Sequence, residues 1–273
     1  MDKETAIAIR ELCTSHGCEI IANPRAIRFD FEEEQPVLTT ELEQTIERLW
    51  AEQVRAHKTK NGRELLNNQF LYVKDHRVVG EKDLYLEFGI TDWKHYSLVK
   101  TIPEAPILWT IGTTGVITFN EAGKRYYVFA TRNANSSNIG GRLEALPGGY
   151  LEPRLIRLAL QDPLSDPFKE NTRKEFEEEV GLPKDSIISL SYIETMRMGR
   201  SHDYSVGYLI DVRTNQKDMS AALESSATGR GEHTQYCIIA ESELPIFIRK
   251  NLNSLTPRTK SNFLTIANNS LLN

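Results

Sequence analysis

One short run, residues 174–182 (KEFEEEVGL), constrains this chain more than any other part of the sequence. It places four glutamates within five positions and ends at a glycine. If the run is helical, Glu175, Glu178 and Glu179 share one face, because residues three and four apart are neighbours on a helix. Like charges at this spacing repel by roughly 0.2–0.5 kcal/mol per pair. Either the face is solvated, as acidic helix faces usually are, or a hard divalent cation offsets the repulsion.

The composition limits what such a face can serve. The chain has 273 residues, of which 40% are hydrophobic and 26% charged, as in ordinary soluble globular proteins. Its net charge of -5 creates no overall basic field, so we expect neither nucleic acid nor a membrane as a partner. No apolar run approaches the roughly 20 residues of a membrane span. The start of the chain also lacks the basic and apolar segments of a secretory signal.

The chain has three cysteines, and this odd number favours a reducing compartment, so we expect a cytoplasmic protein. Cys13 and Cys18 flank His16, but their spacing matches no zinc pattern and no fourth ligand is evident. We interpret both cysteines as structural or incidental.

Periodicity and capping signals predict an N-terminal α/β region. We expect helices over residues 4–13 and 40–57 and strands over residues 20–21, 27–31, 70–73 and 83–90, with a turn near Gly80. Asp92 can cap a short helix that follows it. Two prolines make residues 102–106 the best candidate linker. We therefore predict a first domain over residues 1–103 and a second over residues 104–273.

Strand signals dominate beyond the linker. We expect strands over residues 107–119, 125–132, 187–193, 204–212 and 235–239, and helices over residues 241–251 and 256–267. Residues 150–165 look irregular. Asp166 as N-cap, Pro167 at the first position and Gly181 as the stop predict a helix over residues 167–180.

The Gly148-Gly149 turn, followed by this helix, resembles the Nudix hydrolases. Their box reads Gly, five residues, Glu, seven residues, then Arg-Glu-hydrophobic-any-Glu-Glu-any-Gly-hydrophobic. The second half fits at every position except Lys174, which stands where the family has Arg. Asp166 stands where the family has Glu. Gly149 precedes it by 17 positions instead of six, which corresponds to an insertion of 11 residues.

A narrower resemblance extends over most of the chain. Residues 86–93 (LEFGITDW), 146–153 (LPGGYLEP) and 231–234 (GEHT) are similar to the UDP-glucose/UDP-galactose diphosphatase branch, which also has an N-terminal region and a lengthened box. The extra motifs of the coenzyme A and NADH diphosphatases are absent. The resemblance implies an α+β fold, an α/β/α Nudix sandwich with a mixed sheet, preceded by the smaller α/β region.

The resemblance also implies a chemistry, the hydrolysis of a nucleoside diphosphate sugar to UMP and sugar 1-phosphate with Mg²⁺ or Mn²⁺. It makes Glu175 and Glu179 the direct metal ligands, while Glu178 shares the ion or bridges a second one. Glu177 is expected to be a surface charge. We predict four catalytic residues, Glu175, Glu178, Glu179 and Glu232. Of these, Glu232 is expected to orient or deprotonate the attacking water. We expect residues 231–233 to form a loop before the last strand, and the alternative for Glu232 is that this loop is only a surface loop without a function.

The remaining candidates concern substrate binding. Arg132 either donates to a phosphate or is a surface charge at the end of a strand. Gly148 and Gly149 shape the turn and allow close backbone approach. We interpret His202 and His233 as structural. The rings at positions 72, 85, 88 and 93 stack a uracil or, as we favour, pack in the core.

Two other functions stay open. The first is a Nudix diphosphatase that acts on ADP-ribose or another nucleotide, and the second is a Nudix-like module that binds a nucleotide sugar without cleaving it. In each case the expected partner is a small molecule, and we expect a monomer or a homodimer.

Overall fold

The computed structural model describes residues 7, 13, 17–22, 26–61, 65–79, 83–103, 105–134, 140–162, 164–199 and 201–271. The predicted turn near Gly80 and most of the predicted helix over residues 4–13 lie outside these residues. Within the described part of the chain, no helix is both long and apolar enough to cross a membrane.

The strands form one mixed sheet. They run side by side in the order β1-β9-β10-β5-β3-β4-β2, while β6 pairs with β5, β7 and β11, and β8 pairs with β5. The β10–β5 and β2–β4 pairs are parallel. The bounds are β1 (Cys18–Ala22), β2 (Ala26–Phe31), β3 (Gln69–Val79), β4 (Asp83–Asp92), β5 (Trp109–Glu121), β6 (Lys124–Arg132), β7 (Leu143–Ala145), β8 (Gly148–Tyr150), β9 (Ile187–Met198), β10 (Asp203–Val212) and β11 (His233–Ala240).

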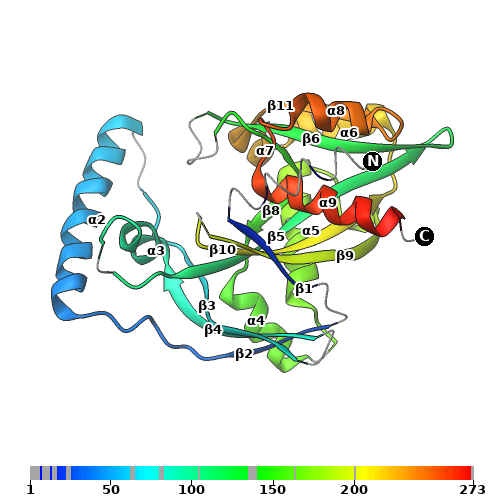
Figure 1. The fold of residues 1–273 in the computed structure, drawn as a ribbon. Coiled ribbons are helices and arrows are strands. Elements are labelled where there is room, and N and C mark those ends of the chain that lie inside the picture. The colour runs from blue at the N-terminus through cyan, green and yellow to red at the C-terminus, as the bar shows by residue number, and fades with distance from the viewer. Residues whose placement is uncertain are drawn as a thin grey trace.

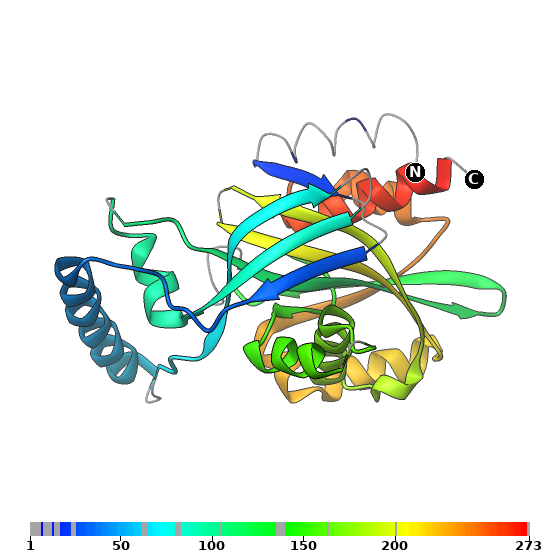
Figure 2. The same cartoon turned by 90° about the horizontal axis from the view of Figure 1, so that it is seen from below.

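Helices cover both faces of this sheet, so the predicted α+β class with a mixed sheet is confirmed (Figure 1, Figure 2). Helix α5 packs with α4, α6 and α7 on one face, and α9 packs on the other. Helix α2 packs on α3 and stands apart at one end of the molecule. The bounds are α2 (Thr40–Asn61), α3 (Trp93–Val99), α4 (Pro153–Gln161), α5 (Pro167–Val180), a 3-10 turn η1 (Lys184–Ser186), α6 (Gln216–Ser225), α7 (Ala227–Glu232), α8 (Leu244–Asn251) and α9 (Pro257–Leu271).

Apolar side chains fix α5 on its face of the sheet. Phe168, Phe176 and Val180 are buried in one cluster with strand residues such as Ile111 and Val206. Burying a side chain of this size contributes about 1.5–3 kcal/mol. These anchors determine how α5 is rotated about its own axis, and hence where its acidic residues lie.

Two interpretations of the sequence are wrong. Residues 150–165 are not irregular, because they contain α4, which begins at Pro153 and buries Leu155, Ile156 and Ala159. Residues 231–233 are not a loop, since α7 and β11 meet there without one.

The division between residues 103 and 104 stays a prediction. Strands from both sides of it share the sheet, because β1 pairs with β9 and β3 pairs with β5.

Candidate active site

Local capping sets the ends of α5, as the sequence predicted. The Asp166 side chain accepts hydrogen bonds from the backbone N–H groups of Phe168 and Lys169, each at 3.1 Å, and Pro167 occupies the first turn. Gly181 ends the helix with φ 81°, a conformation that favours glycine. The predicted helix over residues 167–180 is confirmed at both ends.

The glutamates of α5 differ sharply in their surroundings. Glu179 is only 2% exposed, and its Oε1 accepts a hydrogen bond of 3.2 Å from the backbone N–H of Gly148. Glu175 is half-buried, whereas Glu177 and Glu178 are exposed. The exposure of Glu177 agrees with the expected surface charge. The helix therefore directs Glu175 and Glu179 toward Gly148 and Gly149 and leaves Glu178 nearer to solvent.

Glycine at position 149 is required by the close approach of Glu175. A Cβ atom on Gly149 would lie 2.2 Å from Cδ of Glu175. Gly148 and Gly149 belong to β8, where they pair with Thr114 and Thr113 of β5. The expectation that Gly148 and Gly149 form a turn is therefore wrong, because both belong to a strand, and this strand is in direct contact with the acidic helix.

Lys174 neutralises part of this acidic group. Its Nζ lies 3.0 Å from Glu152 Oε1, 3.1 Å from Glu175 Oε1 and 3.2 Å from Glu178 Oε2. Burial alone would lower the pKa of Lys174, but the charge of Glu175 and the hydrogen bond to Glu152 outweigh it and raise the pKa. The ammonium group is thus held by three carboxylates instead of forming the paired contacts that an arginine would make.

Two acids of α5, the half-buried Glu175 and the buried Glu179, have raised pKa values. Burial raises the pKa of Glu175, against the opposing charge of Lys174. Burial also raises the pKa of Glu179 well above its usual value, and the carboxylates of Glu232 and Glu175 add to the rise. The charge of Glu232 contributes in the same direction at Glu175. The fold therefore concentrates three acids from α5 and α7 where additional positive charge would be favourable.

Arg132 joins Glu232 to a second, buried acid. Its guanidinium lies 3.7 Å from Glu232 Oε2 and donates a hydrogen bond of 2.9 Å to Glu144 Oε1. His233, which is buried, lies with Nε2 3.0 Å from the same Glu144 oxygen. Burial alone would raise the pKa of Glu144, but the hydrogen bond from His233 and the charge of Arg132 lower it. Arg132 is therefore half-buried within an ionic network, and not a free charge at the end of a strand.

The sequence reasoning missed Glu144 and Glu152. Glu144 follows the Gly140-Gly141 stretch, and Glu152 lies within residues 146–153, which carry the narrower resemblance. Neither carries a local signal, because each meets its partner only after the chain has folded.

The carboxylates of the candidate site are possible ligands for a metal ion. Within the described part of the chain, no three His, Cys, Asp or Glu side chains gather closely enough to hold a metal ion. Glu175, Glu178 and Glu179 nevertheless offer hard oxygen donors of the kind that Mg²⁺ prefers. The Lys174 ammonium shows that carboxylates here accept a cation. Glu175, Glu178 and Glu179 thus have the donor chemistry for a divalent ion, but they do not converge on one point in this arrangement.

Comparisons with known proteins concern the fold. No protein-family model matches the chain, and no curated protein matches it either. Among solved structures, a mutT/nudix family protein from Listeria innocua is 17% identical with a TM-score of 0.37, over 60% of this chain and 98% of that chain. An Ap4A hydrolase from C. elegans is 14% identical with a TM-score of 0.38, over 59% and 98%. A NUDIX hydrolase from Nitrosomonas europaea is 13% identical with a TM-score of 0.38, over 59% and 90%. At these scores the likeness carries no conclusion about activity, which has to come from the side chains.

Proposed function

We propose that the chain is a Nudix hydrolase that cleaves the diphosphate bond of a nucleoside diphosphate sugar. The leading substrates are UDP-glucose and UDP-galactose, with UMP and sugar 1-phosphate as products. The observation that carries this proposal is the packing of the half-buried Glu175 and the buried Glu179 against Gly148 and Gly149 of β8. Burial and the carboxylates of Glu232 and Glu175 raise the pKa of Glu179, and a buried acid in such surroundings is stabilised in its charged form by a nearby cation.

Glu175, Glu178 and Glu179 would hold Mg²⁺ or Mn²⁺. When bound, the ion supplies neutralisation of the phosphate oxygens and a lower pKa for a bound water. Their donor atoms are all carboxylate oxygens, and Glu178 keeps 46% of its side chain accessible to an incoming ion.

The other residues act on the water and the phosphates. Hydrolysis adds water across the P–O–P bridge, so one proton must leave the attacking water, and Glu232 is our candidate to accept it. Arg132 would donate to a phosphate oxygen with those guanidinium N–H groups that Glu144 does not engage. Glu144 and His233 would position Arg132.

Glu179→Gln tests the proposal. The amide keeps the size of the side chain and an acceptor for the Gly148 N–H, so we expect an intact fold but a loss of Mg²⁺-dependent turnover of about 100-fold or more. Turnover is measured on UDP-glucose, UDP-galactose and ADP-ribose through release of phosphatase-sensitive products. Glu177→Gln, on the exposed side of the same helix, is the matched control and should retain turnover. A folded Glu179→Gln protein with near-wild-type rate would refute the role, and preference for ADP-ribose would refute the substrate.

Lys174 favours a second candidate, a module that binds a nucleotide sugar without cleaving it. Its ammonium already contacts Glu175 and Glu178 and so supplies positive charge to these carboxylates without a metal ion. In that case UDP-glucose binds to the wild-type chain with or without Mg²⁺, and no substrate is turned over. A cytoplasmic location and a monomeric or homodimeric state stay predictions of the sequence.

A further inference from the structure

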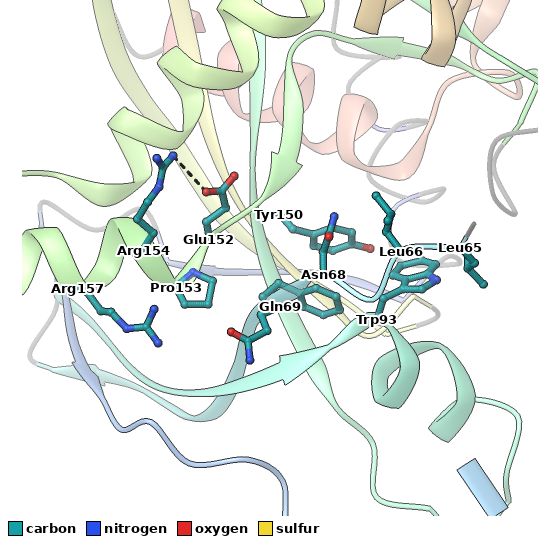
Figure 3. A pocket seen from close by; sticks show the side chains of 11 residues that line it. Leu65, Leu66, Asn68, Gln69, Trp93, Tyr150, Glu152, Pro153, Arg154 and Arg157 are labelled. Atoms are coloured by element: carbon teal, nitrogen blue, oxygen red, sulfur yellow. Dashed lines mark ion pairs between the residues drawn. The ribbon is translucent and has the colours of Figure 1, made fainter. Parts of the chain in front are cut away.

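A large cavity opens beside the acidic site (Figure 3). Its volume is about 870 Å³, within the roughly 300–1,000 Å³ of small-molecule sites. The segment from β8 into α4 forms one wall, and the start of β3 together with α3 forms the other. We propose that this cavity binds the nucleoside of the substrate, with the base against Trp93. The inference rests on the proposed function and adds to it a place for the base.

The cavity borders the acidic site. Glu152 lines it, and the same carboxylate lies 3.0 Å from Lys174 Nζ on the acidic helix. Tyr150, another lining residue, directly follows Gly149 in β8. A ligand that fills the cavity therefore lies next to strand β8, against which Glu175 and Glu179 are packed.

The two ends of the cavity differ in chemistry. Figure 3 shows Arg154 and Arg157, from α4, at one end and Leu66 and Trp93 at the other. Each arginine forms an ion pair, Arg154 with Glu152 at 3.3 Å and Arg157 with Glu33. The side chains of Arg154 and Arg157 are nevertheless 66% and 42% exposed. A nucleotide has the same polarity, with anionic phosphates at one end and a flat ring at the other. The arginines and the nearby acidic site accordingly fit the phosphate end.

Trp93 is held in place before any ligand arrives. Its ring meets the ring of Phe70 edge-on, with centroids 6.4 Å apart, and Phe70 stacks on Tyr150 at 5.2 Å. Phe70 is buried, whereas Trp93 is half-buried and lines the cavity. A fixed, partly exposed ring is a stacking platform, and stacking on an aromatic side chain contributes substantially to the binding of a base.

Two side-chain amides supply polar recognition next to this platform. Asn68 and Gln69 line the cavity, are exposed, and make no side-chain hydrogen bond to any described residue. An amide presents a donor beside an acceptor, which complements the alternating N–H and C=O groups on the edge of uracil. The cavity therefore suits a base with such an edge better than a purely apolar ligand.

The test is the binding of UMP, which has no diphosphate to cleave, to the full chain in Mg²⁺ by titration calorimetry. Trp93→Ala should weaken UMP binding by about 10-fold or more. Trp50→Ala is the matched control, because Trp50 is also half-buried and packs in the same apolar cluster as Trp93 but does not line the cavity, and this variant should bind UMP like the wild type. Asn68→Ala removes an exposed amide and should therefore leave the fold intact. It should also weaken the binding of UMP.

The outcomes separate this inference from the proposed function. UMP affinity that is unchanged in both Trp93→Ala and Asn68→Ala would overturn the inference, as would a Trp93 dependence shown by glucose 1-phosphate but not by UMP. Trp93-dependent UMP binding without turnover of UDP-glucose supports the cavity and overturns the hydrolase. Turnover with a KM insensitive to Trp93→Ala supports the hydrolase and overturns the cavity.

Discussion

Gly148 and Gly149 are adjacent residues with opposite tolerance for a side chain. A Cβ atom on Gly149 would lie 2.2 Å from the Glu175 carboxylate carbon, whereas one on Gly148 would find its nearest neighbour, the Thr113 carbonyl oxygen, at 3.6 Å. We expect Gly149→Ala to displace Glu175 and to lower kcat/KM for UDP-glucose by about 100-fold, the scale of effect that small misplacements produce. Gly148→Ala should lose much less activity. Equal losses in the two variants, measured with thermal melts to confirm folding, would contradict the assignment of Glu175.

A buried acid away from the candidate site makes stability depend on pH. Glu194 is fully buried, and one of its oxygens accepts a hydrogen bond from Thr265 while the other has no partner among the described residues. Burial raises the pKa of Glu194 to about 6. The fold therefore favours the protonated form. This contribution to stability is full below the unfolded pKa of about 4.5 and is lost as the pH rises through 6.

Glu194→Gln is neutral at every pH and should remove that loss. At pH 7.5 we expect it to be more stable than the wild type by about 2 kcal/mol, and the difference should vanish near pH 4.5. Urea denaturation of both proteins at each pH measures it. Glu224→Gln, at an exposed position of α6, should show no such dependence. A Glu194→Gln difference that is constant between the two pH values would count against the buried charge.

Single residues could be predicted from the sequence when their partners are close along the chain. Asp166 and Gly181 are such residues, because each satisfies backbone groups within its own helix. The role of Glu144 could not be predicted, since Arg132 lies 12 positions away and His233 lies 89 positions away. Only the folded sheet brings β6, β7 and β11 together.

At the scale of elements, Asp166 acts as the cap of α5. The family resemblance places an acid at this position, and here its oxygen accepts from two backbone N–H groups at 3.1 Å. We expect Asp166→Ala to destabilise the protein by about 1 kcal/mol and Asp166→Asn to preserve its stability, because asparagine caps equally well. Denaturant unfolding measures both changes. A drop in kcat for folded Asp166→Asn would show instead that the carboxylate takes part in catalysis.

Elements with local signals were predictable, and those that depend on tertiary contacts were not. The ends of α5 follow from Asp166, Pro167 and Gly181, and the structure places them as predicted. Helix α7 contains Gly229 and Gly231, both poor helix formers. It forms because Ser226 caps the Gly229 N–H at 2.9 Å and because Gly229 packs directly on α5. The sequence alone therefore gave no reason to expect a helix before β11.

At the scale of the whole molecule, one apolar core crosses the predicted boundary between residues 103 and 104. Phe29 and Phe88, from β2 and β4, meet ring to ring with centroids 6.0 Å apart, and Phe29 also meets Phe168 of α5 at 6.4 Å. The N-terminal strands thus supply part of the surface on which the acidic helix rests. The cavity beside Trp93 likewise takes its walls from both sides of the boundary.

Removal of residues 1–103 should therefore unfold the rest of the chain. The deleted segment includes buried side chains of the shared core, namely Leu71, Val73, Leu84, Leu86 and Phe88. Lost burial of about 1.5–3 kcal/mol per side chain is comparable with the roughly 5–15 kcal/mol that stabilises a whole domain. We expect the full chain to unfold in one transition, coincident by far-UV circular dichroism and tryptophan fluorescence, and residues 104–273 alone to show no cooperative transition. A truncated chain that unfolds cooperatively would establish two independent domains and separate the N-terminal strands from the stability of α5.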